Sequence, residues 1–102
     1  MAKVVFSDGT GYKKRPALII SRDKYNKNRN EIIIAAVTSN TDRKLYGDTG
    51  IRQWEQAGLL FPSQVTGIVQ TLHKNMIERK LGTLSETDFQ AVKKNLKISI
   101  SI

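Results

Sequence analysis

Two apolar segments separated by a basic stretch constrain the fold of this chain most strongly. Residues 31–38 are nearly continuously apolar, which predicts a strand buried on both faces. Residues 16–21 are aliphatic and predict an earlier strand, with Pro16 at its first position, where a missing N–H costs least. Residues 22–30 are polar. The pattern therefore predicts a hairpin whose long loop displays Arg22, Lys24, Lys27 and Arg29.

The segments around this hairpin are less regular. Residues 4–6 form a short apolar stub, and Asp8-Gly-Thr-Gly after it is typical of a turn. Residues 39–50 are polar, contain two glycines and predict a mobile loop. Residues 51–57 predict a short helix that ends at Gly58, with Trp54 turned inward.

A further strand is predicted over residues 65–72. Gly67 interrupts it and indicates either a bulge or a close approach of another backbone segment. Residues 76–81 are compatible with a short strand or with a turn of helix.

The C-terminal helix has the strongest local signal. Ser85 is a good N-cap, Asp88 has capping-box-like spacing, and Leu84 is placed to pack on Phe89. Apolar residues then recur at helical spacing, with lysines outside the stripe, at Phe89, Val92 and Leu96. The tail, residues 98–102, alternates Ile and Ser, which suits an edge strand or a frayed end.

Length and composition limit the classes of protein that this chain can belong to. A chain of 102 residues predicts a single domain, residues 1–102. With no cysteine and one histidine, it offers neither disulfides, nor thiol nucleophiles, nor a His- or Cys-based metal site. The longest apolar run, residues 32–37, is too short to span a bilayer, and no signal segment opens the chain. We expect a cytoplasmic protein that needs no metal or other cofactor and does not bind membranes.

Positive charge is concentrated near the N-terminus. The formal net charge is +8, and eight of the 17 basic residues lie within the first 30 positions, against two of the nine acidic residues. A positive face of this kind suits a polyanion such as nucleic acid, because phosphate contacts release counterions. The alternative explanation of the positive charge is that the lysines only keep a small protein soluble.

The available side chains suit phosphodiester chemistry in RNA. No phosphate-binding glycine loop, nucleophile elbow or metal-ligand cluster is present, and Asp8-Gly-Thr differs in order from the Asp-Thr-Gly of aspartic proteases. In RNA the nucleophile is the substrate's own 2′-hydroxyl. The protein then needs a guanidinium, which donates bidentately to phosphate oxygens, and hydroxyl or backbone donors beside it.

Four ordered blocks of sequence resemble the PemK/MazF toxins of type II toxin–antitoxin systems. The blocks are KKRPALIIS at residues 13–21, AAVTS at 35–39, AGLLFPS at 57–63, and QTL at 70–72 followed by RKLGTLS at 79–85. The resemblance implies a mainly β fold with a C-terminal α-helix, a small SH3-like barrel of the CcdB/PemK/MazF type. The family's full opening strand has only residues 3–6 as its counterpart, so we expect the first strand to be short or truncated.

The resemblance also implies an activity. It predicts a metal-independent endoribonuclease, an mRNA interferase, that cuts single-stranded RNA and leaves 2′,3′-cyclic phosphate and 5′-hydroxyl ends. The implied partners are single-stranded RNA, an acidic antitoxin that blocks the RNA groove, and a second copy in a homodimer.

Site residues follow from the matching motifs. Arg15 corresponds to the Arg expected to stabilise the phosphorane, and Thr38 to the Thr expected to hold the scissile phosphate. The segment 9–14 resembles the loop that gates the groove. The predicted RNA-binding residues are Tyr12, Lys13, Lys14, Ser39, Arg43, Gln70 and His73.

Two departures from the family pattern leave other functions open. Many members carry an acid where this chain has Gly67, and an Arg where it has Gln70. A member that binds RNA or an antitoxin without cleaving is therefore an alternative. A DNA gyrase inhibitor similar to the CcdB toxins shares the barrel and is a third possibility.

Overall fold

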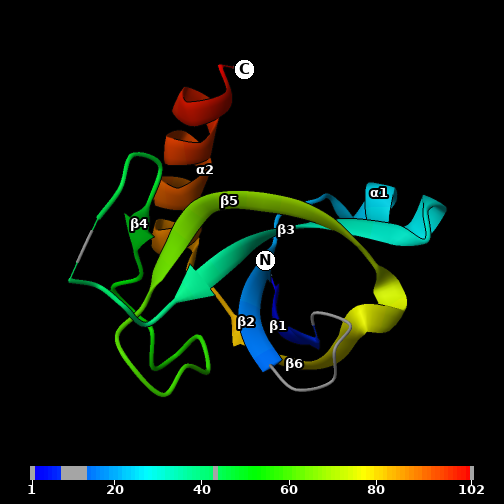
Figure 1. Ribbon diagram of the computed structural model, residues 1–102, viewed down its shortest axis with the longest axis horizontal. Helices are drawn as coiled ribbons and strands as arrows, with labels where there is room; N and C mark the ends of the chain where they lie inside the picture. The colour runs from blue at the N-terminus through cyan, green and yellow to red at the C-terminus, as the bar shows by residue number, and fades with distance from the viewer. Residues whose placement is uncertain (1, 8–13, 43, 102) are drawn as a thin grey trace.

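One curled antiparallel sheet and a long C-terminal helix make up the structure (Figure 1). The computed structural model describes residues 2–7, 14–42 and 44–101. The strands, in chain order, are β1 Ala2–Ser7, β2 Lys14–Ile19, β3 Glu31–Thr38, β4 Thr49–Gly50, β5 Gln64–His73 and β6 Ile77–Thr83. The helices are α1 Asp23–Asn28, the single 3-10 turn η1 Lys74–Met76, and α2 Glu86–Ile100.

The strand order confirms the predicted fold class. The sheet runs β4-β5-β3-β2-β1-β6, so strands that are distant in sequence become neighbours. The sheet curls strongly, as an SH3-like barrel does, but β4 and β6 are left as its two edges (Figure 1). The result is a mainly β fold with α2 lying beside β4 and β5.

The first strand, expected to be short or truncated, is shorter than β3, β5 and β6 but takes a full part in the sheet. β1 has six residues, as many as β2, and it pairs with β2 on one side and with β6 on the other. Its pairing with β6 contains two register shifts. Backbone pairing with β2 and β6 therefore stabilises β1 on both sides, and the local sequence does not indicate these partners. The predicted turn at residues 8–11 and the groove loop at 9–14 lie outside the described residues, apart from the backbone of Lys14.

β2 and β3 pair with each other, as the predicted hairpin requires, and lie at the centre of the sheet. Ala35 and Val37 join Leu18 in the main apolar cluster, whereas Ile32 and Ile34 join a smaller cluster. β3 is therefore buried on both faces. Pro16, expected first in its strand, is the third residue of β2; the ladder with β3 begins after it, at Ala17, so the missing N–H costs no bond there.

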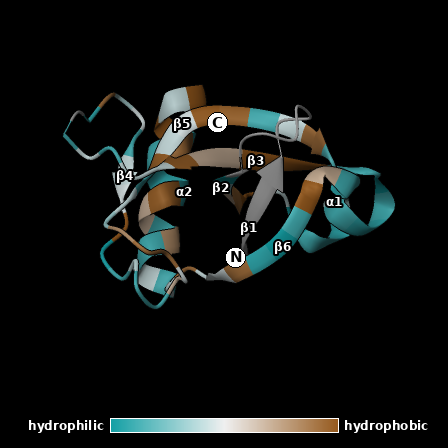
Figure 2. Ribbon diagram, turned by 60° about the horizontal axis from the view of Figure 1, so that its bottom comes forward, coloured by the Kyte–Doolittle hydropathy of each residue, from teal (hydrophilic) through white to brown (hydrophobic). Residues whose placement is uncertain are grey.

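The connection between β2 and β3 is a helix, not the predicted loop. α1 is short and hydrophilic (teal in Figure 2) and has no buried residue. Asn26 fixes its start: the backbone N–H of Asn26 donates to the carbonyl of Arg22, and its side-chain amide donates to the carbonyl of Ser21. The hydroxyl of Ser21 also donates to the side-chain oxygen of Asn26. The helix is therefore held by side-chain hydrogen bonds and not by an apolar face, which is why no apolar periodicity predicted it.

The predicted helix over residues 51–57 is also wrong. The segment forms successive turns, although Gly58 ends it with a positive φ of 84° and Trp54 packs inward against the core, both as expected. The hydrogen bonds of the segment are mixed in type, because the N–H of Ala57 donates to Gln53, four residues back, whereas that of Gly58 donates to Glu55, three residues back. The start of the segment is also held by α2, since the two carboxylate oxygens of Asp88 accept the backbone N–H groups of Arg52 and Gln53, 36 and 35 positions away, at 3.0 Å each.

β5 contains the irregularity that Gly67 predicted. Its register against β3 shifts between Ala35 and Val37, opposite Gly67. The hydroxyl of Thr66 donates to the carbonyl of Ala36 and accepts the N–H of Ile68, which satisfies backbone groups at the bulge. A second segment also lies close, because a Cβ on Gly67 would be 3.6 Å from the carbonyl oxygen of Tyr46. Residues 76–81, which were compatible with a strand or with a turn of helix, belong mostly to β6 and thus form a strand.

α2 begins as predicted and ends later than predicted. The hydroxyl of Ser85 accepts the N–H of Asp88 at 3.1 Å, and Val92 and Leu96 are buried in the main cluster with Phe89 packed against it. The alternation of Ile and Ser in the tail does not form an edge strand. The helix continues to Ile100 and leaves Ile98 and Ile100 exposed, so helical hydrogen bonding outweighs the period-two pattern.

Candidate functional site

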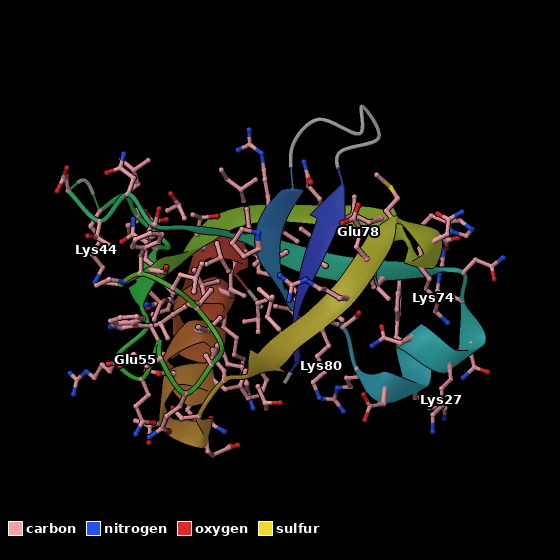
Figure 3. The ribbon with its side chains drawn as sticks, turned by 90° about the horizontal axis from the view of Figure 1, so that it is seen from below. Lys27, Lys44, Glu55, Lys74, Glu78 and Lys80 are labelled. Carbon is pink, nitrogen blue, oxygen red and sulfur yellow. The ribbon has the colours of Figure 1, made fainter. Side chains whose placement is uncertain are left out.

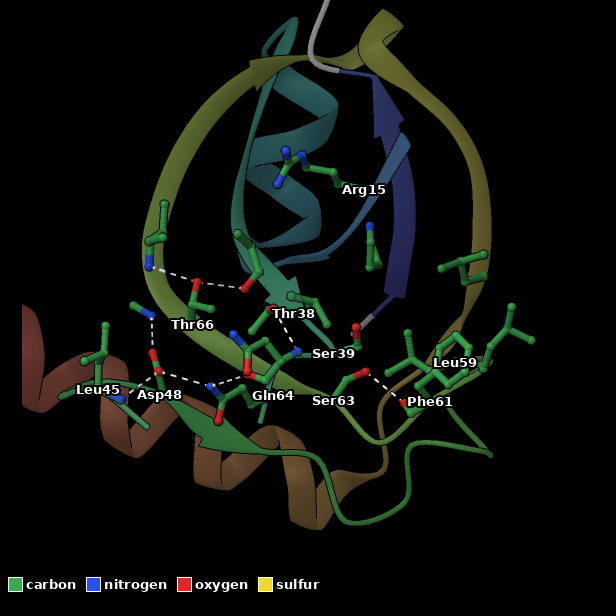
Figure 4. A pocket seen from close by; sticks show the side chains of 18 of the residues that line it. Arg15, Thr38, Ser39, Leu45, Asp48, Leu59, Phe61, Ser63, Gln64 and Thr66 are labelled. Carbon is green, nitrogen blue, oxygen red and sulfur yellow. Dashed lines mark hydrogen bonds between the residues drawn. The ribbon is translucent and has the colours of Figure 1, made fainter. Parts of the chain in front are cut away.

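A pocket of about 960 Å³ opens where β2, β3 and β5 meet the loop before β4 (Figure 4). The strands contribute its base, the segment 39–48 forms one wall, and the segment 58–63 forms another. Residues Arg79 and Leu81 of β6 complete the lining. The pocket therefore gathers residues from elements that the curled sheet brings together.

Arg15 and Thr38, the two residues assigned to the reaction, line this same pocket. Arg15 is the second residue of β2 and has an exposed side chain, so its guanidinium keeps donors for a ligand. Thr38 ends β3 and is half-buried. Ser39 follows it, exposed at the pocket edge.

The hydroxyl of Thr38 has a defined role in its local hydrogen bonding. Its Oγ1 accepts the backbone N–H of Asn40 at 3.1 Å. A hydroxyl has one proton and two lone pairs, so accepting this bond leaves its O–H available to donate. Thr38 is thereby suited to donate to an anionic oxygen in the pocket.

A buried carboxylate in the pocket wall was not identified from the sequence. Asp48 is 7% exposed, and its oxygens accept the backbone N–H of Leu45 at 2.9 Å and of Gly67 at 3.3 Å. It also accepts from the side-chain amide of Gln64 at 3.3 Å. Asp48 thus joins the loop before β4 to β5. No periodic pattern marks a loop aspartate as buried, so the sequence held no signal for it.

The rim of the pocket is apolar and exposed. Large side chains with more than half of their surface exposed surround the opening, namely Leu45, Tyr46, Leu60, Phe61 and Ile68. Exposed aromatic and aliphatic groups beside hydrogen-bond donors suit a ligand with both flat apolar and polar parts.

The structure does not bring all the predicted RNA-binding residues to this pocket. Gln70 and His73 lie on β5 with exposed side chains and are not part of the lining. The Nδ1 of His73 accepts the N–H of Asn75 at 3.2 Å, which gives this histidine a local structural role. Tyr12, Lys13 and Arg43 lie outside the described residues, as does the side chain of Lys14, so their roles stay predictions.

The basic segment between β2 and β3 also lies away from the pocket. Figure 3 places Lys27 and Lys74 together at the α1 end of the molecule and Lys44 at the opposite end. Arg29 is paired with Glu31 at 2.9 Å, and this hydrogen bond raises the pKa of the guanidinium. Among the described lining residues, the charged groups are Arg15, Asp48 and Arg79.

The donors in the pocket suit an anionic ligand. Arg15, Arg79 and Thr38 all line it, and Asp48 is already engaged by three N–H donors. Within the described part of the chain, no group of three His, Cys, Asp or Glu residues is placed to hold a metal ion. A search for membrane-spanning helices, made on the same residues, finds none that is long and apolar enough.

Comparison with known proteins gives one family and several related structures. The family model described as PemK-like, MazF-like toxin of type II toxin–antitoxin system matches residues 3–100. No curated protein matches the chain.

Several solved structures are similar to this chain. The Mycobacterium tuberculosis toxin MazF-mt6 is 22% identical with a TM-score of 0.81, over 99% of this chain and 96% of that one. An endoribonuclease in complex with its cognate antitoxin, from a mycobacterial species, is 17% identical with a TM-score of 0.81, over 99% and 92%. MazE-MazF from Deinococcus radiodurans is 17% identical with a TM-score of 0.80, also over 99% and 92%. At these identities the likeness establishes the shared fold.

Proposed function

Because the chain belongs to the family of PemK-like, MazF-like toxins of type II toxin–antitoxin systems, we propose that it is an endoribonuclease acting on single-stranded RNA in the cytoplasm. The observation that carries this proposal is the meeting of Arg15 and Thr38 in one pocket. An always-charged guanidinium and a free hydroxyl proton are the groups that a strained phosphate needs.

The proposed reaction needs no metal ion. The 2′-oxygen of the RNA forms a bond to phosphorus, the bond from phosphorus to the 5′-oxygen breaks, and the 2′-hydroxyl proton is removed while the 5′-oxygen gains one. The products are a 2′,3′-cyclic phosphate and a 5′-hydroxyl. Arg15 donates to two oxygens of the pentacoordinate phosphorane, and the hydroxyl of Thr38 donates to a non-bridging oxygen.

Cleavage of a long single-stranded RNA in EDTA tests this proposal. We expect 2′,3′-cyclic ends from the wild-type protein, and a loss of about 10²–10³-fold in kcat for Arg15→Ala, as when one charge-stabilising donor is removed. Thr38→Val, which keeps the shape of the side chain without its hydroxyl, should also lose most of its activity. Arg52→Ala is the matched control, because Arg52 is exposed and does not line the pocket.

Cleavage that Arg15→Ala leaves undiminished would reject the assignment. Binding of RNA by the wild-type protein without any cleavage would favour the non-catalytic alternative. Inhibition of gyrase supercoiling without RNA cleavage would favour the third function.

We also propose an acidic antitoxin as a protein partner. The net charge of +8 and the exposed apolar rim of the pocket suit an acidic segment with apolar side chains. Two similar structures are a toxin with its cognate antitoxin and MazE-MazF. Co-purification with the product of an adjacent acidic reading frame, with loss of RNA cleavage in the complex, is the expected result.

A homodimer is the proposed assembly of the toxin. β5 exposes Ile68 and Val69, and α2 exposes Ile98 and Ile100, which leaves apolar area on both elements. Light scattering on the purified protein should give twice the mass of 11.5 kDa. A mass that stays monomeric at micromolar concentration contradicts this assembly.

A further inference from the structure

A continuous chain of hydrogen bonds runs from Asp48 to Thr38 through two other residues (Figure 4). The side-chain amide nitrogen of Gln64 donates to Oδ2 of Asp48 and to the backbone carbonyl of Asn40, at 3.3 Å each. The backbone N–H of Asn40 in turn donates to Oγ1 of Thr38 at 3.1 Å. The chain thus links a buried carboxylate in the pocket wall to the hydroxyl beside the proposed phosphate site.

We propose that Asp48 and Gln64 are positioning residues that hold the Thr38 hydroxyl ready to donate to the scissile phosphate. This inference rests on the proposed ribonuclease function. The Asp48 end of this hydrogen-bond chain is buried, since Asp48 is 7% exposed and Gln64 is 4% exposed. Asn40 is exposed and lies in the loop, and the hydrogen bond from the Gln64 amide to its carbonyl connects it to the buried part of the sheet.

The chemistry of the partners determines how the Gln64 amide is oriented. Its nitrogen faces two oxygens that can only accept, a carboxylate and a carbonyl, so the amino group must point toward them. With the amide held this way, Asn40 stays where its N–H meets Oγ1 of Thr38. The O–H of Thr38 is then the group left to donate.

A carboxylate at position 48 fits this arrangement better than an amide would. Three donors converge on Asp48, from Leu45, Gln64 and Gly67. An ionised carboxylate accepts from all three, whereas an amide would present N–H groups to at least one of them.

The first test is Gln64→Met, which keeps the length of the side chain and removes its donor. We expect kcat for RNA cleavage to fall about 10- to 100-fold, as when a reacting group is displaced by a fraction of an ångström to an ångström. KM should change less than threefold, and exchange of the Asn40 amide hydrogen should accelerate. Gln90→Met is the matched control, because Gln90 lies on the exposed side of α2 and bonds only to Glu86 among the contacts described.

The second test is the double variant Asp48→Asn/Gln64→Glu, which exchanges the donor and the acceptor. The new pair can hydrogen-bond to each other and keeps the net charge, but a carboxylate at position 64 cannot donate to Asn40. We expect the double variant to be more stable than either single variant while its kcat stays low. A purely structural pair would instead recover activity together with stability.

The outcomes separate this inference from the proposed function. If the wild-type protein cleaves RNA and Gln64→Met cleaves equally fast, the positioning role is overturned and the ribonuclease stands. A rise in KM with unchanged kcat would mean that Gln64 contacts RNA directly, which also overturns it. If the wild-type protein does not cleave, the proposed function fails, and the exchange rate of the Asn40 amide alone decides whether the hydrogen-bond chain exists.

Discussion

Gly58 and Gly82 face each other with no room for a side chain on either one. A Cβ on Gly58 would lie 2.2 Å from the carbonyl oxygen of Leu81, and a Cβ on Gly82 would lie 2.6 Å from that of Ala57. Gly58 also has a positive φ of 84°. This contact fixes the turns after β4 against β6, and with them the pocket wall that begins at Gly58.

Alanine at either glycine should destabilise the protein. We expect Gly82→Ala to cost about 1–3 kcal/mol through overpacking against backbone, and Gly58→Ala about 1–2 kcal/mol more because of its left-handed conformation. Gly50→Ala is the control, since a Cβ there meets nothing within 4 Å. Urea denaturation measures all three, and equal midpoints would contradict the close contact.

Asp88 gives a second prediction about stability. Its two carboxylate oxygens accept the N–H groups of Arg52 and Gln53, and it is 3% exposed. Asp88→Asn turns one acceptor of a buried side chain into a donor that faces a backbone N–H, so we expect a loss of about 1–3 kcal/mol. The control Glu86→Gln, in the same first turn but exposed, should change the free energy of unfolding by less than about 0.5 kcal/mol.

Such long-range contacts explain which parts of the fold could be predicted from sequence. β3 and the start of α2 have strong local signals, an apolar run and the Ser85 cap, and both were predicted correctly. The segment 51–57 was mistaken for a helix because a pattern that ends at Gly58 does not distinguish a helix from successive turns with mixed hydrogen-bond spacing. For β1 the local sequence indicated a short strand but could not show that it pairs with β2 on one side and with β6 on the other.

The candidate site was predictable only where a motif marks it. Arg15 and Thr38 came from family-like blocks, and the structure places both in one pocket. Asp48 and Gln64 have no motif, and they meet only because Gly50 of β4 pairs with Gln64 of β5. A single sequence does not contain that register. The net charge likewise did not predict where on the molecule the site lies, since Lys27 of the basic segment lies at the α1 end and does not line the pocket.

Measurements of RNA affinity should distinguish basic residues that line the pocket from those of α1. Arg79 lines the pocket and Lys27 does not. Arg79→Gln should therefore weaken binding of single-stranded RNA and reduce the slope of log K against log salt concentration by about 0.7, the value for one phosphate contact. Lys27→Gln, which removes the same unit of charge, should leave that slope unchanged. Fluorescence anisotropy at four salt concentrations measures both, and equal slopes for the two variants would argue for binding by net charge alone.

The last prediction concerns Gly67, the position at which the family resemblance led us to expect an acid. A Cβ there has ordinary contacts, the nearest being 3.6 Å from the carbonyl oxygen of Tyr46, so Gly67→Ala should be close to neutral. Gly67→Asp places a second carboxylate beside Asp48, which already accepts the Gly67 N–H at 3.3 Å. Repulsion should destabilise the folded protein by about 1–3 kcal/mol at neutral pH.

The pH dependence of that loss has a definite sign. The neighbouring negative charge raises the pKa of the introduced carboxyl group in the folded protein above its unfolded value. Its penalty is therefore full above the folded pKa and shrinks as the pH falls and the group takes up a proton. Urea midpoints of Gly67→Asp and Gly67→Ala should converge between pH 7 and pH 4. A gap that stays constant over this range would mean that the loss is steric and not electrostatic.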